Sequence, residues 1–267
     1  MASMAHGLAP INRIFPEPVT AATDDQLLQW YGDVPQSGNR VRFNFVSSLD
    51  GAATLEGRSG GLGNAEDQHV FQLLRRLADV VLVGAGTVRA EGYGGDLLGA
   101  EARRWRADRG MPEHPAVAVV SGSLDLDPSS AFFGEAPVRP LLFTSAEADP
   151  ARRKELAAVA DVVEAGQERV EPAGIVRALA ERGLQQIHCE GGPALLGSFE
   201  AAGLVDELCL TVSPLLVGGT GTRIARSGGG HPPQPLRLVH VLESDSMLLL
   251  RYAAHRPAPD GSPAELG

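Results

Sequence analysis

Residues 73–89 read LLRRLADVVLVGAGTVR, and this stretch decides the fold class of the chain. Its first part ends an amphipathic helical pattern that runs over Ala65–Leu77. The apolar run Val80–Gly84 follows, as expected of a strand that is buried on both faces of a sheet. Glycines then lead into the next helical segment. Helix, buried strand and glycine turn in this order predict an α/β fold with a largely parallel sheet.

The same alternation extends over most of the chain. The other predicted strands are Val41–Ser47, Ala116–Ser121, Pro140–Thr144, Asp161–Glu164, Ile187–Glu190, Leu208–Ser213, Leu236–Leu242 and Met247–Tyr252. Further helices are predicted at Ala151–Ala160, Ala173–Arg182 and Ala194–Ala202, with prolines at their starts. Because only the short turn Glu243–Asp245 separates the last two strands, we expect the sheet to end in an antiparallel hairpin.

The pattern predicts one folded domain over residues 41–256. Residues 1–40 are expected to form an irregular segment that packs on this domain, with one short helix around Asp24–Tyr31. The tail over residues 257–267 is expected to be disordered. Apolar strands over Asp206–Ser213 and Leu236–Tyr252 near a sheet edge favour pairing with a second copy, as a homodimer.

Composition excludes several classes of function. The formal net charge is −10, and a protein without a dense basic patch is not expected to bind nucleic acid. The arginines within residues 103–109 are interrupted by acidic Asp108 and preceded by Glu101, which favours a solvated helix face. There is no apolar run of about 18 residues and no signal-peptide pattern, so neither membrane insertion nor export is expected, and a cytoplasmic location is predicted. Cys189 and Cys209 are interpreted as buried free thiols, and no metal site is predicted.

The turn Ala85-Gly86-Thr87 follows the strand Val80–Gly84 directly. A glycine turn between strand and helix exposes backbone amides at a helix N-terminus, where a phosphate can bind. The turn is similar to the dinucleotide fingerprint G-x-G-x-x-G, but Arg89 occupies the third glycine position. The alternative interpretation is a tight turn without a ligand.

A second glycine turn lies in residues 187–198, which read IHCEGGPALLGS. Two adjacent glycines let a backbone approach a pyrophosphate closely, and a proline opens the following helix. Glu190 stands at the C-terminal end of the strand, and ligands of open α/β sheets bind at that edge. Alternatively, Glu190 is only an exposed loop residue.

A third segment joins SSLDGA at residues 47–52 to GRSGG at residues 57–61. By itself it predicts a strand, a turn and a flexible loop. A mobile glycine-rich loop beside a sheet edge can close over a cofactor.

In their order and spacing, these segments resemble the reductase domain of the bacterial riboflavin-biosynthesis deaminase/reductase, within the dihydrofolate-reductase-like superfamily. Gly203–Leu208 (GLVDEL) and Pro214–Gly219 (PLLVGG) add to the resemblance, which covers about residues 40–253. It implies a mixed, mostly parallel sheet flanked by helices, a homodimer and NADPH as cofactor. The His-x-Glu and Pro-Cys-x-x-Cys motifs of a zinc deaminase are absent from the sequence.

By position, the resemblance implies the roles of individual residues. Glu190 and Asp50 are the candidate catalytic carboxylates, and no general acid is identified. Arg89 is placed for the extra phosphate of NADPH, with Arg152 and Arg153 as alternatives. The implied cofactor contacts are Ser47, Gly61, Gly84, Gly86, Thr87, Arg89, Glu91, Ser121, Gly191, Gly192, Pro193, Ala194, Leu195 and Leu196. The implied substrate contacts are Asn44, Ser59, Arg75 and Glu190, although Arg75 could instead pair with Asp79 one helical turn away.

The reaction that the resemblance implies is hydride transfer to the ribose C1′ of a ribosylaminopyrimidine phosphate, as in a 5-amino-6-(5-phosphoribosylamino)uracil reductase. The sequence departs from the family at Asn44, where many members have Lys, and at Gly61, where many have Trp. Glu91 stands where Asp is common, and the Asp-Asn-Pro stretch with its downstream Arg is missing. A reductase of a pterin or dihydrofolate-like substrate, or a non-catalytic NADP-binding paralogue, are the alternatives.

Overall fold

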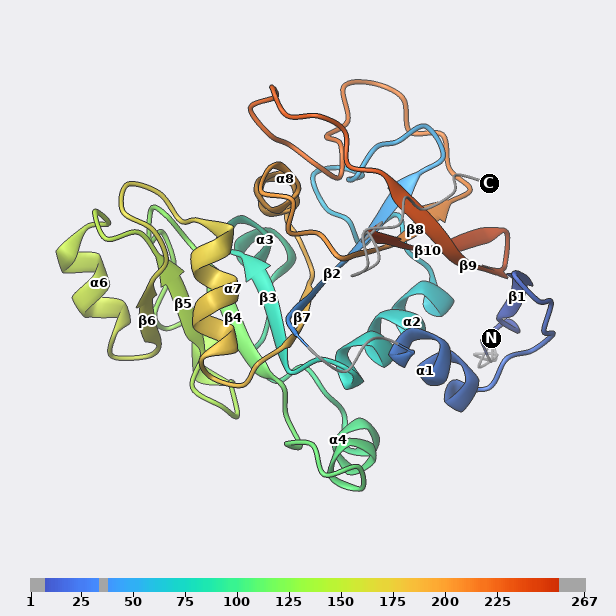
Figure 1. Cartoon of the computed structure of the whole chain (residues 1–267), viewed down its shortest axis with the longest axis horizontal. Helices are drawn as coiled ribbons and strands as arrows, with labels where there is room; N and C mark the ends of the chain where they lie inside the picture. Colours follow the sequence, from blue (N-terminus) through green and yellow to red (C-terminus); the bar gives the residue numbers. More distant parts are fainter. Residues whose placement is uncertain (1–7, 34–37, 255–267) are drawn as a thin grey trace, which may run out of the picture.

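The computed structural model describes residues 8–33 and 38–254, which form a single ten-stranded sheet flanked by helices (Figure 1). The strand order is β1-β9-β10-β8-β2-β7-β3-β4-β5-β6. The strands are β1 (Asn12–Phe15), β2 (Arg40–Ser48), β3 (Val80–Gly84), β4 (Ala116–Val120), β5 (Leu141–Thr144), β6 (Asp161–Glu164), β7 (Gln186–Cys189), β8 (Glu207–Ser213), β9 (Leu236–Ser244) and β10 (Met247–Ala254).

The strands from β8 through β6 in this order are parallel, whereas β10, β9 and β1 are added antiparallel at the other end. The predicted fold class, including the final antiparallel hairpin, is therefore confirmed. The strand bounds Val80–Gly84 and Asp161–Glu164 agree with the prediction to the residue. The continuous apolar runs are explained by burial of β3, β4 and β5 on both faces.

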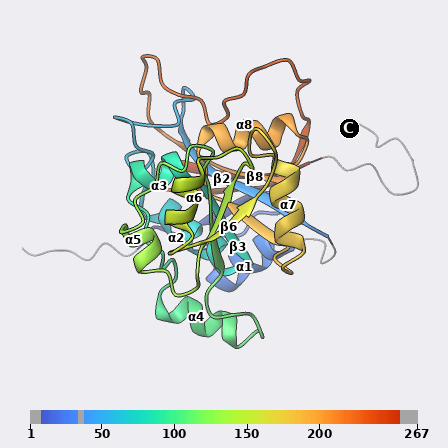
Figure 2. The same cartoon turned by 90° about the vertical axis from the view of Figure 1, so that its left-hand side faces the viewer.

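Eight helices are present in the described residues. They are α1 (Asp24–Gly32), α2 (Ala65–Arg76), α3 (Ala85–Glu91), α4 (Ala100–Ala107), α5 (Ala131–Gly134), α6 (Pro150–Leu156), α7 (Pro172–Ala180) and α8 (Pro193–Ala201). Figure 2 shows α7 on one side of the sheet and α3 and α5 on the other. Accordingly, Ile175 and Leu179 of α7 and Phe199 of α8 pack on one face of the central strands. The other face is covered by α3, α5 and α6 over β3–β5, and by α1 and α2 over β8–β10.

The N-terminal segment differs from the prediction, because it is not irregular. Asn12–Phe15 forms β1, which pairs with β9 at the edge of the sheet. Thr23 is the N-cap of helix α1, and its side chain accepts a hydrogen bond from the Gln26 backbone in a capping box. Its residue Tyr31 is 1% exposed. This segment is thus an integral part of the sheet and of one hydrophobic layer, while the predicted disordered tail, 257–267, lies outside the described residues.

Of the arginines at 103–109, Arg104 and Arg109 are exposed as predicted, whereas Arg106 is not. Arg106 is 1% exposed and donates to the carbonyl oxygens of Arg76 and Ala78 at 2.8 and 2.7 Å. Its guanidinium thereby satisfies carbonyl groups at the C-terminus of α2, where a positive charge is favourable. Both cysteines, by contrast, are free and buried as predicted.

A buried ion cluster joins β2, β8 and β10 beneath α1. The carboxylate of Glu207 is fully buried and contacts Arg40 at 2.9 Å, Arg42 at 3.1 Å and also Arg251. Arg42 and Arg251 also donate to the backbone carbonyls of Tyr31 and Trp30 at the end of α1. The cluster therefore ties the N-terminal helix to the sheet.

Candidate active site

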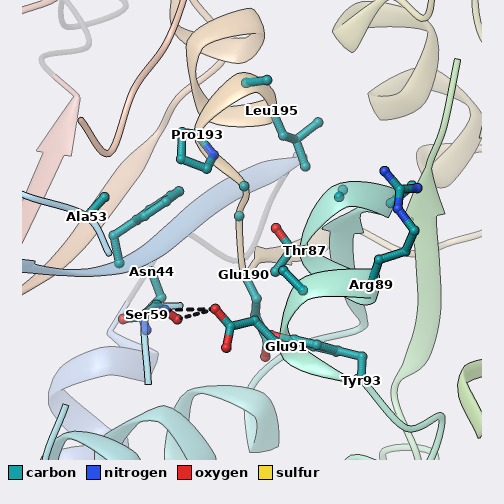
Figure 3. Close-up of a pocket in the computed structure, with 18 of the residues that line it drawn as sticks. Asn44, Ala53, Ser59, Thr87, Arg89, Glu91, Tyr93, Glu190, Pro193 and Leu195 are labelled. Carbon is teal, nitrogen blue, oxygen red and sulfur yellow. Dashed lines mark hydrogen bonds between the residues drawn. The ribbon is translucent and has the colours of Figure 1, made fainter. Parts of the chain in front are cut away.

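A cavity of about 880 Å³ lies at the C-terminal edges of β2, β7, β3 and β4. It has the size of a cofactor or substrate site, and its place is the edge at which open α/β sheets bind ligands. Figure 3 shows Thr87, Glu91 and Tyr93 of one segment beside Glu190 and Pro193 of another. Of the residues predicted from the sequence, those that line this cavity are Asn44, Ser59, Arg75, Gly84, Gly86, Thr87, Arg89, Glu91, Ser121, Glu190, Gly191, Gly192, Pro193, Ala194 and Leu195.

The two glycine turns meet at the centre of the cavity. The Gly84 amide donates to the Gly191 carbonyl at 2.8 Å. A methyl group on Gly192 would lie 2.7 Å from the Thr87 hydroxyl, so glycine is required for this close approach. A methyl group on Gly86, by contrast, would meet no atom within 4 Å. The backbone at the start of α3 thus faces open space, as a site for an anionic ligand requires.

Ser121, directly after β4, carries an unsatisfied hydroxyl. Its side chain is 4% exposed and lines the cavity, and its oxygen has no hydrogen-bond partner. A buried polar atom without a partner costs free energy unless a ligand or water completes it. Arg89 lines the same end of the cavity and forms an ion pair with Asp125 at 3.4 Å. These groups fit the sugar and phosphate of a nucleotide.

Glu190 is buried rather than exposed, so the interpretation of an exposed loop residue is wrong. Its two oxygens accept hydrogen bonds from Arg75 at 2.6 and 2.8 Å, and the Tyr93 hydroxyl donates to one of them at 2.7 Å. Burial by itself would raise the pKa of Glu190, but the guanidinium of Arg75 outweighs it and holds this pKa below its usual value. Glu190 is therefore an ionised anchor and not a proton donor.

The alternative partner that was predicted for Arg75 is wrong. Arg75 does not pair with Asp79, whose carboxylate accepts the amides of Gln185 and Gln186 instead. The guanidinium lies 4.3 Å from the centre of the Phe71 ring. Glu190 balances the charge of Arg75, so the pair as a whole is neutral, which weakens its attraction for a phosphate.

The glycine-rich loop is tied to α3 by one carboxylate. Glu91 accepts hydrogen bonds from the backbone amide of Ser59 at 2.8 Å and from its hydroxyl at 3.0 Å, drawn as dashed lines in Figure 3. From the sequence, Glu91 was predicted to contact the cofactor and Ser59 the substrate. The fold brings the two residues together at one wall of the cavity. The loop is thereby held beside the sheet edge.

Four predicted residues do not line the cavity: Ser47, Asp50, Gly61 and Leu196. Asp50 is exposed and accepts the amides of Val217 and Gly218 at 3.2 and 2.7 Å. Hydrogen bonds from Ser48 and from these amides lower its pKa to about 2. In the structure this carboxylate organises the loop after β8. Leu196 belongs to the hydrophobic core, and Ser47 is buried within β2.

Several residues that line the cavity were not predicted from the sequence. Asp67, Phe71 and Arg75 follow one another at intervals of four on α2, so they share one face of the helix. This spacing was the available signal for Asp67 and Phe71. Tyr93 gave no comparable signal, because its contact with Glu190 joins residues 97 positions apart.

In the part of the chain that the structure describes, no helix is both long and apolar enough to span a bilayer. Nor do its histidine, cysteine and acidic side chains gather in any group of three or more that could bind a metal ion.

Comparisons with known proteins identify the family of this chain. The family model described as RibD C-terminal domain matches residues 39–250. A 2,5-diamino-6-ribosylamino-4(3H)-pyrimidinone 5′-phosphate reductase from Archaeoglobus fulgidus is 31% identical over 67% of this chain and 82% of its own length. A crystal structure of a pyrimidine reductase-like protein from Corynebacterium diphtheriae has a TM-score of 0.79 and 29% identity, covering 88% of this chain and all of that one.

The fold is shared more widely. The deaminase/reductase from Thermotoga maritima has a TM-score of 0.62 at 22% identity, and the match covers 82% of this chain and 57% of that one. With the family match over most of its length, the chain belongs to the RibD C-terminal domain family.

Proposed function

We propose that this chain is an NADPH-dependent reductase of a ribosylaminopyrimidine 5′-phosphate in riboflavin biosynthesis, acting in the cytoplasm. The observation that carries the proposal is the cavity itself, in which two glycine turns face the buried pair of Glu190 and Arg75. The named reductase from A. fulgidus supports the substrate class. A C–H bond would form at C1′ of the ring-opened ribose while its double bond to nitrogen becomes a single bond, and the nitrogen would take a proton from water or from a substrate group.

The residues present fit NADPH. The turns at Gly84–Thr87 and Gly191–Ala194 would hold its diphosphate, and Ser121 with Arg89 would hold the phosphorylated adenosine. When bound, the nicotinamide supplies the hydride. The residues of this chain then position the substrate: Glu190 keeps Arg75 and Tyr93 in place, and Asn44 lines the cavity with a neutral amide.

The substrate phosphate needs a partner other than Arg75. We assign it to the loop that carries Ser59, where Arg58 is exposed and follows Gly57 at the rim of the cavity. Ser59 of this loop binds Glu91, and the backbone of Arg58 pairs with that of Leu55. Neither contact engages the guanidinium of Arg58.

The direct test is NADPH oxidation, followed by nicotinamide absorbance, with the ribosylaminopyrimidine phosphate and with dihydrofolate in parallel. Turnover of the phosphate supports the proposal. Turnover of dihydrofolate alone would favour a pterin-like substrate. The neutral side chain of Asn44 and the ion pair that balances the charge of Arg75 are consistent with that alternative. Tight NADPH binding without turnover of either substrate would indicate a non-catalytic paralogue.

Arg89 is expected to read the extra phosphate of NADPH. Arg89→Ala should weaken NADPH binding about tenfold or more and leave NADH binding unchanged, since only NADPH carries this phosphate. The alternatives are disfavoured because Arg152 and Arg153 are held by backbone carbonyls outside the cavity. Titration of both cofactors by fluorescence measures the effect. Arg223→Ala, an exposed arginine outside the cavity, is the control, and an equal loss for both cofactors would contradict the assignment.

A homodimer is also proposed, but on a different surface from the free strand edges expected from the sequence. In the structure β8 and β10 are interior strands and β1 covers the edge of β9. What remains is an apolar outer face, where Leu248 pairs with Val212 and Leu250 with Leu210 across neighbouring strands. Leu248 is 37% exposed. An apolar face of this kind favours association with a second copy.

Light scattering at micromolar concentration should give twice the mass of one chain. Leu248→Lys should shift the protein toward the monomer, because it places a charge on this face. A monomeric wild type with intact NADPH binding would refute the dimer.

A further inference from the structure

A second cavity lies at the opposite end of the parallel strands from the active cavity. Its volume is about 340 Å³, which is at the lower end of the range of small-molecule sites, roughly 300–1,000 Å³. It is lined by the first part of β2, by β7 and by the ends of α1 and α2. Among the residues that the structure describes, none that lines it also lines the active cavity, so the two cavities are separate.

Two arginines and a histidine form the sheet side of this second cavity. Arg42 pairs with His188 across β2 and β7, and Arg40 precedes Arg42 by two residues in the same strand. Because side chains alternate along a strand, all three point to one face of the sheet. Leu74 and Leu77, at the end of α2, contribute an apolar surface. The second cavity thus combines a positively charged wall with an apolar one.

Arg40 and Arg42 have more donors and more charge than their partners use. Glu207 binds them at 2.9 and 3.1 Å and also binds Arg251. A carboxylate offers only about four acceptor sites, against five N–H donors in each guanidinium, and carbonyl groups at the end of α1 accept two more of these donors. Asp79 lines the second cavity and balances one further charge, although its carboxylate also accepts two backbone amides. Positive charge and N–H donors therefore remain for an anion.

Buried polar atoms of this wall have no partner. Arg42 is 8% exposed, and its Nε makes no hydrogen bond to any described residue. His188 is 2% exposed, and neither of its ring nitrogens has a partner in the same part of the chain. Such atoms cost free energy unless a ligand or water completes them. Because the two residues are direct neighbours across the strands, one ligand with acceptor oxygens can complete both.

His188 also stands between the two cavities. Its Nε2 lies 3.6 Å from Oε1 of Glu190, the carboxylate that binds Arg75 in the active cavity. Burial lowers the pKa of His188 to about 4, so its ring is neutral at neutral pH and carries a single N–H. The bond that one ring nitrogen makes decides which nitrogen holds this proton. An oxyanion in the second cavity would draw the proton to its own side, and Nε2 would then face Glu190 with a lone pair.

The shape of the charged groups indicates the class of ligand. A planar carboxylate matches a guanidinium through two parallel hydrogen bonds. The small volume and the leucines leave room for an apolar body of about one ring.

We propose that the second cavity is a regulatory site for a small ring carboxylate, whose anionic group is held by Arg40 and Arg42 and whose binding weakens the Glu190–Arg75 pair through His188. The binding part is independent of the proposed function, whereas its effect on turnover rests on that function.

The first test measures binding, with benzoate as the probe. Titration of the NADPH complex, followed by protein NMR, should show benzoate binding at least tenfold more tightly than benzyl alcohol, which carries the same ring without charge. Arg40→Gln should weaken benzoate binding at least tenfold, and Leu77→Trp should block it by filling the apolar side. Arg237→Gln, an exposed arginine that lines neither cavity, is the matched control.

Three results would overturn the site: no binding of benzoate, equal binding of benzoate and benzyl alcohol, or benzoate binding that Arg40→Gln and Leu77→Trp leave unchanged. The last of these would place the probe elsewhere on the protein.

The second test measures the link to the active cavity. Saturating benzoate should raise KM for the ribosylaminopyrimidine phosphate at least threefold in the wild type, because the pair that positions the substrate is weakened. His188→Phe removes the N–H, so it should still bind benzoate but lose this response. An unchanged KM in the wild type, or the same response in His188→Phe, overturns the link. If neither substrate is turned over, the ring resonances of His188 should still shift with benzoate and not with benzyl alcohol; the proposed function then fails and the site stands.

Discussion

Replacing Glu207 with glutamine is expected to lower the free energy of unfolding by about 3–5 kcal/mol, because it leaves buried positive charge without its counter-ion. The carboxylate is fully buried and contacts Arg40, Arg42 and Arg251. Without it, the arginine side chains repel one another between β2 and β10. Since two of them also bind carbonyl groups at the end of α1, we expect that helix to loosen first.

Chemical denaturation followed by circular dichroism measures this loss. Arg40→Gln is the graded control, because two arginines still hold the carboxylate and the loss should be much smaller. Burial would raise the pKa of Glu207, but the three arginines outweigh it and lower it to about 2 from 4.5. The stabilisation is therefore complete above about pH 4.5 and is lost as the pH falls toward 2, a dependence that Glu207→Gln should lack. A loss below about 1 kcal/mol would show that the cluster is unimportant.

Glu190→Gln is expected to reduce kcat/KM for the pyrimidine substrate roughly a hundredfold or more. A charge-assisted hydrogen bond contributes about 1.5–3 kcal/mol, and Arg75 donates two of them to the two oxygens of Glu190. Glutamine keeps one acceptor oxygen for a weaker bond, and its NH2 group cannot accept the other. The arginine would then carry an unbalanced charge in the cavity. Both the shape and the electrostatics of the substrate side depend on this pair.

Steady-state kinetics with NADPH, together with thermal unfolding, separates loss of function from loss of fold. Tyr93→Phe removes a single hydrogen bond to Glu190 and should cost about tenfold or less. Wild-type kinetics in Glu190→Gln would mean that the buried pair plays no part in positioning the substrate.

The parallel core was predictable from sequence because its signals are local. Val80–Gly84 is apolar throughout, and a glycine turn follows it directly, so strand and turn could be located to the residue. By contrast, β1 has four residues and exists only because it pairs with β9, as Asn12 does with Glu243. No local pattern contains that information.

In the site, too, local features were predictable and long-range contacts were not. The glycine turns were found because their conformational demands are visible in the sequence. Which carboxylates lie in the cavity and which lie outside it, by contrast, depends on the tertiary structure. An aspartate before a glycine, such as Asp50, suits a turn as well as catalysis, and its partners at Val217 and Gly218 are distant in the chain. Asp67 was missed because an acidic residue is ordinary in the first turn of a helix. Only tertiary packing makes it a buried wall of the cavity.

The position of β1 and α1 has a practical consequence for anyone who trims this protein. The family match begins at residue 39, yet a fragment cut there would lack the strand that covers β9 and the helix residues Leu27 and Tyr31 that fill the layer above it. The exposed backbone edge of β9 could then form hydrogen bonds with strands of neighbouring chains, which favours aggregation. The evolutionary module and the smallest autonomous folding unit are therefore different lengths of this polypeptide.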